Sequence, residues 1–308
     1  MSKENTAVTK KKIKRCKEDV VFDAACFIIL TLVLFVVAYP LYWVIISSIS
    51  APSAVSSGKV LLHPIGFTLK GYAEVFKNDQ VMRGFLNSLI ITFCGVMVNL
   101  IVTLPTSYAL SRSNFSGKKP ITIFYLITMF FGGGLIPTYL VIQRLQMLNT
   151  IWALILPGCL SVYNMIVART FKSNISEELY EAAEIDGCTQ ARFFFQIALP
   201  LSKAIIAILV LYYGVGHWNS YFSALVYISD KAKYPLQLVL RNILITNQTA
   251  LSQTATTAAA RAALQEKQQL IDVMKYSLII ISSIPVLVMY PLVQKHFVKG
   301  VMIGSMKG

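Results

Sequence analysis

Charged side chains are scarce in this sequence, and acidic ones are the scarcest. Only 14% of the 308 residues are charged, with 14 Asp and Glu against 28 Lys and Arg, while 56% are hydrophobic and the mean hydropathy is +0.62. One water-soluble core cannot bury that much apolar surface. The composition therefore excludes an ordinary soluble domain and indicates a protein embedded in a membrane.

Several sequence signatures of chemistry are also absent. The chain has no HExxH motif, no serine triad pattern and no paired carboxylates inside its apolar stretches, which argues against a membrane-embedded enzyme. It has no GxxxxGK loop for binding ATP phosphates. The cysteines form no CxxC pair, which indicates neither a disulfide nor a metal site. They are Cys16, Cys26, Cys94, Cys159 and Cys188. We therefore expect no catalytic residue, metal or cofactor on this chain.

Long uncharged stretches, by contrast, are abundant. Six intervals between consecutive charged residues are long enough for the roughly 20 apolar residues that a membrane-spanning helix needs. In hydrocarbon every backbone polar group must be satisfied within the segment, and stretches of this length suit helices rather than the strands of a barrel. The sequence thus predicts an all-α, polytopic membrane protein with six transmembrane helices. Their cores are expected near residues 20–46, 86–110, 121–142, 151–170, 203–226 and 274–294.

The basic residues predict an orientation. Seven Lys and Arg precede the first span, and such flanks stay in the cytoplasm, which places both termini and 17 of the 28 basic residues on that side. The first apolar run is too long for a cleaved signal peptide. The basic residues are dispersed, which indicates contact with anionic lipid and not with nucleic acid. We expect a multi-pass protein of the cell membrane with a cytoplasmic N-terminus (1–19), a transmembrane domain (20–298) and a cytoplasmic tail (299–308).

Two further regions, one in the third span and one in an outer segment, have distinctive compositions. Gly132, Gly133, Gly134 and Pro137 weaken helix continuity in the third span, which predicts a kink or an unwound outer end. The outer segment 228–273 is rich in Ala, Thr and Gln in its second half. We expect that segment to be partly helical and to face solvent.

The inner loop 173–203 is too long to be a simple connection. Ser176 suits an N-cap, acidic residues follow it, and Gly187 suits a left-handed turn, which together predict a helix over 177–186. A second helix is expected from Thr189 to about residue 200, directly before the fifth span. The first helix is acidic in a basic chain and contains two small alanines, which predicts a docking element for another protein. The alternative is a helix pair lying on the membrane, but such helices carry Lys and Arg.

The spacing within this loop is similar to that of a known family. An EAA triplet is followed after three residues by Gly, after nine more by Ile, and after one more by Leu-Pro. The matching positions are Glu181, Ala182, Ala183, Gly187, Ile197, Leu199 and Pro200. This pattern resembles the EAA motif of ABC-importer permeases. With six predicted spans, the chain resembles the carbohydrate-uptake subfamily and the smaller membrane subunit of the maltose transporter. Segments 131–139, 148–154 and 299–308 resemble a Gram-positive branch associated with complex-saccharide uptake.

The resemblance implies a transport subunit that translocates a saccharide, either an oligosaccharide or a fragment of a complex polysaccharide. It implies a second homologous permease subunit, two cytoplasmic ATPase subunits that hold ATP and Mg, and an extracellular lipid-anchored solute-binding protein. The motif residues and Asp186 would couple to an ATPase, whose closure moves the spans between inward-open and outward-open arrangements. The tail from Gly304 to Gly308 would contact the ATPase interface, or else form a frayed end.

Aromatic and amide side chains near spans four and five offer the chemistry that binds sugars. Candidates are Tyr163, Asn164, Tyr212, Tyr213, His217, Trp218, Asn219 and Tyr221. We expect five of them to line a substrate path: Tyr163, Asn164, Tyr213, Trp218 and Asn219. Packing between helices is the alternative for each, since polar groups at membrane depth face either a cavity or another helix.

Two other functions remain open from the sequence. An ABC permease for a non-sugar solute would share the EAA element. An ion-coupled secondary carrier would require an ionisable coupling site, and the interiors of the predicted spans contain no acidic residue.

Overall fold

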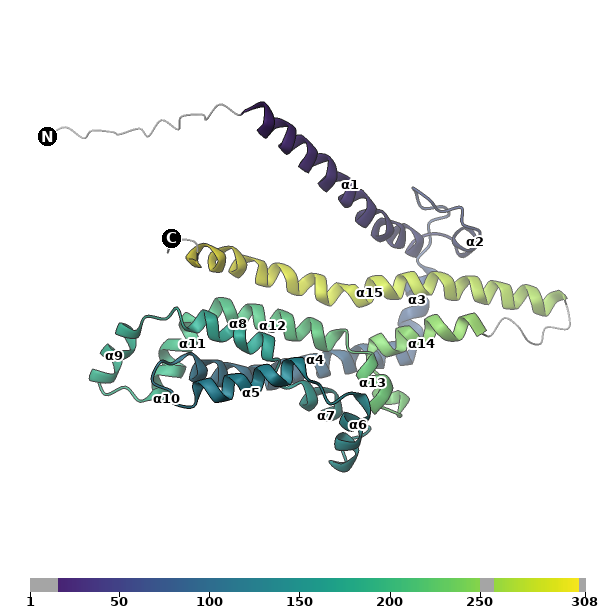
Figure 1. The fold of residues 1–308 in the computed structure, drawn as a ribbon. Coiled ribbons are helices and arrows are strands. Elements are labelled where there is room, and N and C mark those ends of the chain that lie inside the picture. The colour runs from purple at the N-terminus through teal and green to yellow at the C-terminus, as the bar shows by residue number, and fades with distance from the viewer. Residues whose placement is uncertain (1–15, 250–257, 305–308) are drawn as a thin grey trace.

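The structure is a computed structural model that describes residues 16–249 and 258–304, and all regular elements of these two ranges are helices (Figure 1). The predicted all-α fold is confirmed. Most of the basic N-terminus (1–15), part of the outer segment (250–257) and the end of the tail (305–308) lie outside the described residues.

Three helices in the described part are long and apolar enough to cross a membrane. They are α1 (Lys17–Ser48), α4 (Asp79–Ser111) and the stretch Gln268–Pro291 within α15 (Ala258–Gly304). Three further pairs of helices meet the same criteria together, although each is bent at a short break. If each bent pair is one span, the total of six agrees with the sequence prediction.

The third span is interrupted where the glycines predict it. Helix α5 (Lys118–Phe130) and α6 (Leu135–Arg144) meet at 113°. The break contains the three consecutive glycines, and Gly134 has a φ of +84°, a left-handed conformation that glycine adopts without a steric penalty. The expected kink in the third span is therefore confirmed.

The fourth span lies where it was expected, near 151–170, but it is bent and not one regular helix. It consists of α7 (Trp152–Ile155), a 3-10 turn η1 (Leu156–Gly158) and α8 (Val162–Lys172), with a bend of 51°. Pro157 lacks the N–H that a regular helix needs. Ser161 then begins α8 as an N-cap, because its side chain accepts a hydrogen bond from the Asn164 N–H.

The fifth span is also shorter than its expected core of 203–226. Helix α12 (Lys203–Trp218) ends at Trp218 with Asn219 as its C-cap, and a separate helix, α13 (Phe222–Tyr227), follows. The Ser220 hydroxyl donates to the His217 carbonyl at 2.9 Å. Short polar side chains compete in this way with helical hydrogen bonds, and a count of charges does not detect it.

The segments expected outside the membrane contain α2 (Pro52–Ser56), α3 (Lys70–Lys77), the short turn η3 (Lys231–Lys233) and α14 (Leu236–Thr249). The segment 228–273 is partly helical, as expected. Its first helix is not solvent-facing, because Leu236 and Leu238 are fully buried and the Leu236 N–H donates to Ser88 Oγ on α4 at 2.8 Å. The apolar Leu236, Leu238 and Val239 outweigh the polar composition of the residues that follow them.

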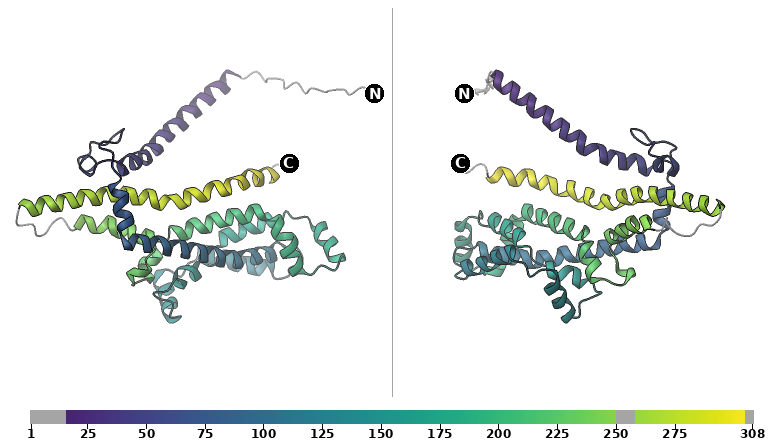
Figure 2. Two further views of the ribbon diagram at one scale, coloured as in Figure 1. Left: turned by 180° about the vertical axis from the view of Figure 1, so that it is seen from behind. Right: turned by 45° about the vertical axis from the view of Figure 1, so that its right-hand side comes forward.

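The centre of the molecule is formed by α4, which packs against α8 and α12, while α15 packs against α12 and α1 against α15. The inner loop forms α9 (Glu177–Ile185), α10 (Gln190–Phe193), the π-helical turn η2 (Phe194–Ala198) and α11 (Leu199–Leu201). The α1 end nearer the N-terminus, the C-terminal end of α15, and α9 lie at the same end of the molecule (Figures 1 and 2).

Candidate functional site

Helix α9 forms where its caps predict it. Ser176 Oγ accepts a hydrogen bond from the Leu179 N–H at 3.3 Å, and Glu177 and Glu178 lie in the first turn. At the other end Gly187 has a φ of +75°, and its N–H donates to the Glu184 carbonyl at 3.0 Å. The helix ends at Ile185, one residue earlier than expected, with Asp186 as its C-cap. This turn, with its left-handed glycine, ends the helix.

The two faces of α9 differ in their surroundings. Tyr180 is buried and Ala183 is partly buried against the body of the protein. Glu181, Ala182 and Asp186 are exposed, and nothing lies within 4 Å of the position that a Cβ would occupy on Gly187. The residues of the predicted motif on α9 are therefore accessible to another molecule, except Ala183, which supports the helix from below.

An aromatic cluster holds the inner face of α9. The Tyr180 and Phe193 rings meet edge to face, with centroids 5.2 Å apart. Tyr108, near the end of α4, stacks on Phe193 and also packs against Phe194 at 5.1 Å. Such aromatic pairs contribute about 0.5–1.5 kcal/mol beyond the burial of their surface. The cluster joins α9, α10 and α4 into one packed unit.

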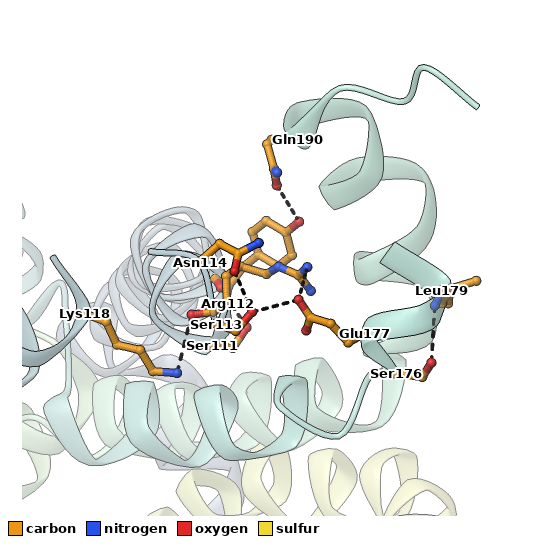
Figure 3. A network of polar contacts seen from close by, with 10 residues as sticks. Ser111, Arg112, Ser113, Asn114, Lys118, Ser176, Glu177, Leu179 and Gln190 are labelled. Atoms are coloured by element: carbon orange, nitrogen blue, oxygen red, sulfur yellow. Dashed lines mark hydrogen bonds and ion pairs between the residues drawn. The ribbon is translucent and has the colours of Figure 1, made fainter. Parts of the chain in front are cut away.

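Arg112 adds a charged contact to this cluster (Figure 3). Its Nη2 donates to Glu177 Oε1 at 3.2 Å, and the Ser113 hydroxyl donates to the same oxygen at 2.8 Å. The guanidinium also lies 3.6 Å from the centroid of the Tyr180 ring, a cation–π arrangement. We call Arg112, Ser113, Glu177 and Tyr180 the Arg112 clamp. It fixes the start of α9 to the end of α4.

Sequence reasoning did not find Arg112. The residue lies 65 positions before Glu177, so no local spacing connects the two. The available signal was its place at the C-cap of a long helix, where a positive charge interacts favourably with the helix dipole.

The second half of the loop also attaches to α4. Thr189 Oγ1 accepts from the Arg192 N–H at 3.3 Å, which confirms the expected helix start. The helix is not regular, however, because its middle is a π-helical turn, and it meets α12 at 79°. Ile197 and Leu199 pack against the aromatic cluster, whereas Pro200 is exposed.

Lys172, the residue directly before the loop, is bonded to α4. Its Nζ is buried and donates to the Leu104 carbonyl at 2.6 Å and to Ser107 Oγ at 3.0 Å, both on α4. Together with the Arg112 clamp, this contact attaches the N-terminal side of α9 to α4 at two points.

The five residues expected to line a substrate path fall into two groups. Asn164, Tyr213 and Trp218 are buried between helices, and Tyr163 and Asn219 are exposed. The Trp218 indole donates to the Ser282 carbonyl at 2.8 Å. The Tyr213 hydroxyl lies 2.7 Å from Thr103 Oγ1 and accepts from the Ser161 N–H at 3.2 Å. Contact of these five residues with a substrate stays a prediction.

A second polar group, which we call the His217 network, lies in the helix core. His217 Nε2 is 2.6 Å from Asn99 Oδ1, and Asn99 Nδ2 donates to the Gly158 carbonyl at 2.7 Å. Because Asn99 Nδ2 donates to the Gly158 carbonyl, Asn99 Oδ1 is the atom that faces His217, and it accepts the proton of the imidazole Nε2. A Cβ on Gly95 would lie 2.5 Å from His217 Nε2, so only glycine leaves room for this ring. The network joins α4 and α12 to the break in the fourth span.

Comparison with known proteins identifies the family. No family model matches the chain. It is 36% identical over 287 residues to the polygalacturonan/rhamnogalacturonan transport system permease protein YtcP of Bacillus subtilis (strain 168), covering 93% of this chain and 98% of the relative. It is 30% identical over 301 residues to the probable ABC transporter permease protein YurM of the same organism, covering 93% of this chain and 89% of the relative.

A solved structure agrees with these relatives. One chain in the crystal structure of a bacterial ABC transporter involved in the import of the acidic polysaccharide alginate matches with a TM-score of 0.83 and 26% identity, over 93% of this chain and 100% of that chain. With relatives this similar over nearly their whole length, the chain belongs to the membrane-embedded permease subunits of ABC sugar transporters, which are transport components rather than enzymes.

Proposed function

We propose that this chain forms part of the membrane pore of an ABC importer for an oligosaccharide or a polysaccharide fragment. The substrate class is supported by the printed names of its relatives, one a polygalacturonan/rhamnogalacturonan permease and the other an importer of alginate. A lipid-anchored solute-binding protein outside the cell would deliver the saccharide. A second homologous permease subunit would complete the pore.

In this proposal α9 docks into a cleft of a cytoplasmic ATPase subunit. The observation that carries it is the two-sided character of α9. Its inner face is fixed to α4 by the Arg112 clamp, while Glu181, Ala182 and Asp186 are exposed on its other side. The small Ala182 lets a partner approach the backbone closely, and the acidic groups suit basic or polar groups on that partner. The described ends of α1 and α15 lie at the same end of the molecule as α9, so both termini would be cytoplasmic.

The contacts of α9 also supply a route for motion. ATP and Mg would bind to two partner ATPase subunits, and closure of those subunits would draw the docking helices together. The Arg112 clamp and Lys172 pass that displacement to α4, and α11 passes it to α12. The spans would then change from an inward-open to an outward-open arrangement, and hydrolysis of ATP would reset them.

The test is the ATPase activity of the reconstituted complex with and without saccharide-loaded binding protein. We expect Glu181→Lys and Gly187→Asp to abolish the stimulation by saccharide while the pore subunits remain folded and paired. Glu18→Lys is the matched control, because Glu18 is an exposed acid at the same end of the molecule but lies on α1. Unchanged stimulation in the α9 variants, or absence of any co-purifying ATPase, would contradict the proposal.

A further inference from the structure

The loop after α2 folds back along the outer end of α1. The chain turns at Gly58, whose φ is +69°, and residues 60–62 then run beside α1. The loop lies next to the end of α1 in both figures (Figures 1 and 2). Three aromatic donors of α1 hold this segment. Trp43 Nε1 donates to the Val60 carbonyl at 2.8 Å, the Tyr42 hydroxyl to the Leu62 carbonyl at 2.6 Å, and the Tyr39 hydroxyl to the Leu61 carbonyl at 3.4 Å.

These bonds leave two large apolar side chains pointing away from the protein. Val60 is buried, but Leu61 and Leu62 are 60% and 68% exposed. Their carbonyls are satisfied by the aromatic donors, so the segment needs no water at its backbone acceptors. The adjacent Lys59 is exposed. A short segment with satisfied carbonyls, exposed leucines and a flanking lysine suits the boundary between hydrocarbon and head groups.

The length of α1 places this segment at that boundary. The helix carries no charged residue after Asp23. From residue 24 to Trp43 it rises about 30 Å at 1.5 Å per residue, which matches the thickness of the hydrocarbon core. Tyr39, Tyr42 and Trp43 therefore lie at the outer interface, where aromatic residues with a polar edge are enriched. The segment bonded to them lies at the same depth.

We propose that Leu61 and Leu62 form an interfacial anchor that inserts into the outer leaflet, with membrane lipid as the partner. The direction of the fold-back favours lipid over a protein in the aqueous phase, because residues 60–62 return toward the bilayer. The anchor holds the outer end of α1 at a fixed depth, and α1 in turn packs on α15 through Trp43 and Tyr276, whose rings meet edge to face at 5.1 Å. This inference needs only the membrane location of the chain and not the proposed substrate or ATPase docking.

The returning part of the same loop provides a matched control. The Thr68 N–H donates to the Ile49 carbonyl and the Ala51 N–H to the Ile65 carbonyl, both at 2.9 Å, so residues 65–68 lie beside residues 49–51. Along the axis of α1, Ile49 lies about 9 Å beyond Trp43, at 1.5 Å per helical residue. Phe67 is 72% exposed there. It is an exposed aromatic residue of the same loop, and we place it in water.

The experiment compares Leu62→Trp with Phe67→Trp in the assembled transporter in lipid vesicles, each as the fluorescence difference from the unaltered protein. The quenchers are lipids brominated near the head group and iodide in the water. We expect the signal at position 62 to be blue-shifted and lost in brominated lipid but insensitive to iodide. The signal at position 67 should respond in the opposite way. Leu61→Trp repeats the test if Leu62→Trp does not assemble.

Two results would overturn the anchor. Quenching of position 62 by iodide and not by brominated lipid would place the leucines in water. Protection of position 62 from both quenchers would show that another protein subunit covers them.

Discussion

The Arg112 clamp and the His217 network attach the same helix, α4, to its neighbours by different physical means. The clamp uses full charges near water, with Arg112 12% and Glu177 44% exposed at the side chain. The network uses an amide and an imidazole group, and Asn99 is fully buried. An exposed ion pair contributes about 0–1 kcal/mol, whereas a buried polar group that loses its partner costs about 1–3 kcal/mol. We therefore expect the network to contribute more to the stability of the helix bundle than the ion pair of the clamp, which fixes the position of α9.

This difference suits two tasks within one moving subunit. The clamp joins α9 to α4 at the end that we assign to the cytoplasm, and the network joins α4 to α12 within the helix core. In the proposed mechanism, a force applied at α9 would reach α4 through the clamp and α12 through α11. The network would then keep these two helices together, so that the two routes move one body.

The largest effect is expected at Gly95, where a methyl group would displace the His217 ring. Gly95→Ala should lower the free energy of unfolding by up to about 3 kcal/mol, through overpacking and loss of the bond to Asn99. Thermal unfolding in detergent measures this loss. Gly216→Ala is the control on α12, since nothing lies within 4 Å of its Cβ position. Equal stability of the two variants would show that the network is not tightly packed.

Tyr213 tests whether a residue of the predicted substrate path is also structural. Tyr213→Phe leaves the Ser161 N–H and Thr103 without their shared partner, which should cost about 2 kcal/mol. Tyr212→Phe is the matched control, because that side chain is 42% exposed. A changed KM for saccharide uptake at unaltered stability would instead make Tyr213 a substrate contact.

A smaller effect is expected at the turn that ends α9. Gly187→Ala introduces a side chain at a φ of +75° where no neighbour would clash, so the cost is backbone strain of about 1 kcal/mol. Hydrogen exchange of the α9 amides should accelerate in this variant. Gly187→Asn should exchange more slowly than Gly187→Ala, because asparagine tolerates the left-handed region. Identical exchange in the alanine variant and the unaltered protein would contradict this account of the turn.

The smallest effect is expected for the ion pair in the clamp. A double-mutant cycle of Arg112→Gln and Glu177→Gln, measured by the same exchange experiment, should give a coupling energy of about 0.5 kcal/mol that falls as salt is added. Arg112→Lys keeps the charge but loses the planar group that stacks on Tyr180. A coupling energy that does not respond to salt would place the pair in a drier environment than the clamp provides.

Local signals predicted α9 well, and long-range contacts were beyond their reach. Ser176 and Gly187 act on neighbouring backbone groups, so their residue types predicted both ends of the helix to within one residue. The partners of Arg112 and His217 lie 65 and 118 positions away, and no spacing in one sequence connects them. The break after Trp218 was not predicted, because Asn219 and Ser220 are uncharged and a count of charges treats them as part of a span.

The central claim is that the exposed face of α9 docks onto an ATPase subunit. The most direct measurement places a photo-cross-linking amino acid at position 182 in the assembled transporter and, as a control, at position 18 on α1. We predict an adduct with the ATPase from position 182 and none from position 18. An intact complex that hydrolyses ATP yet gives no adduct from position 182 would contradict the account.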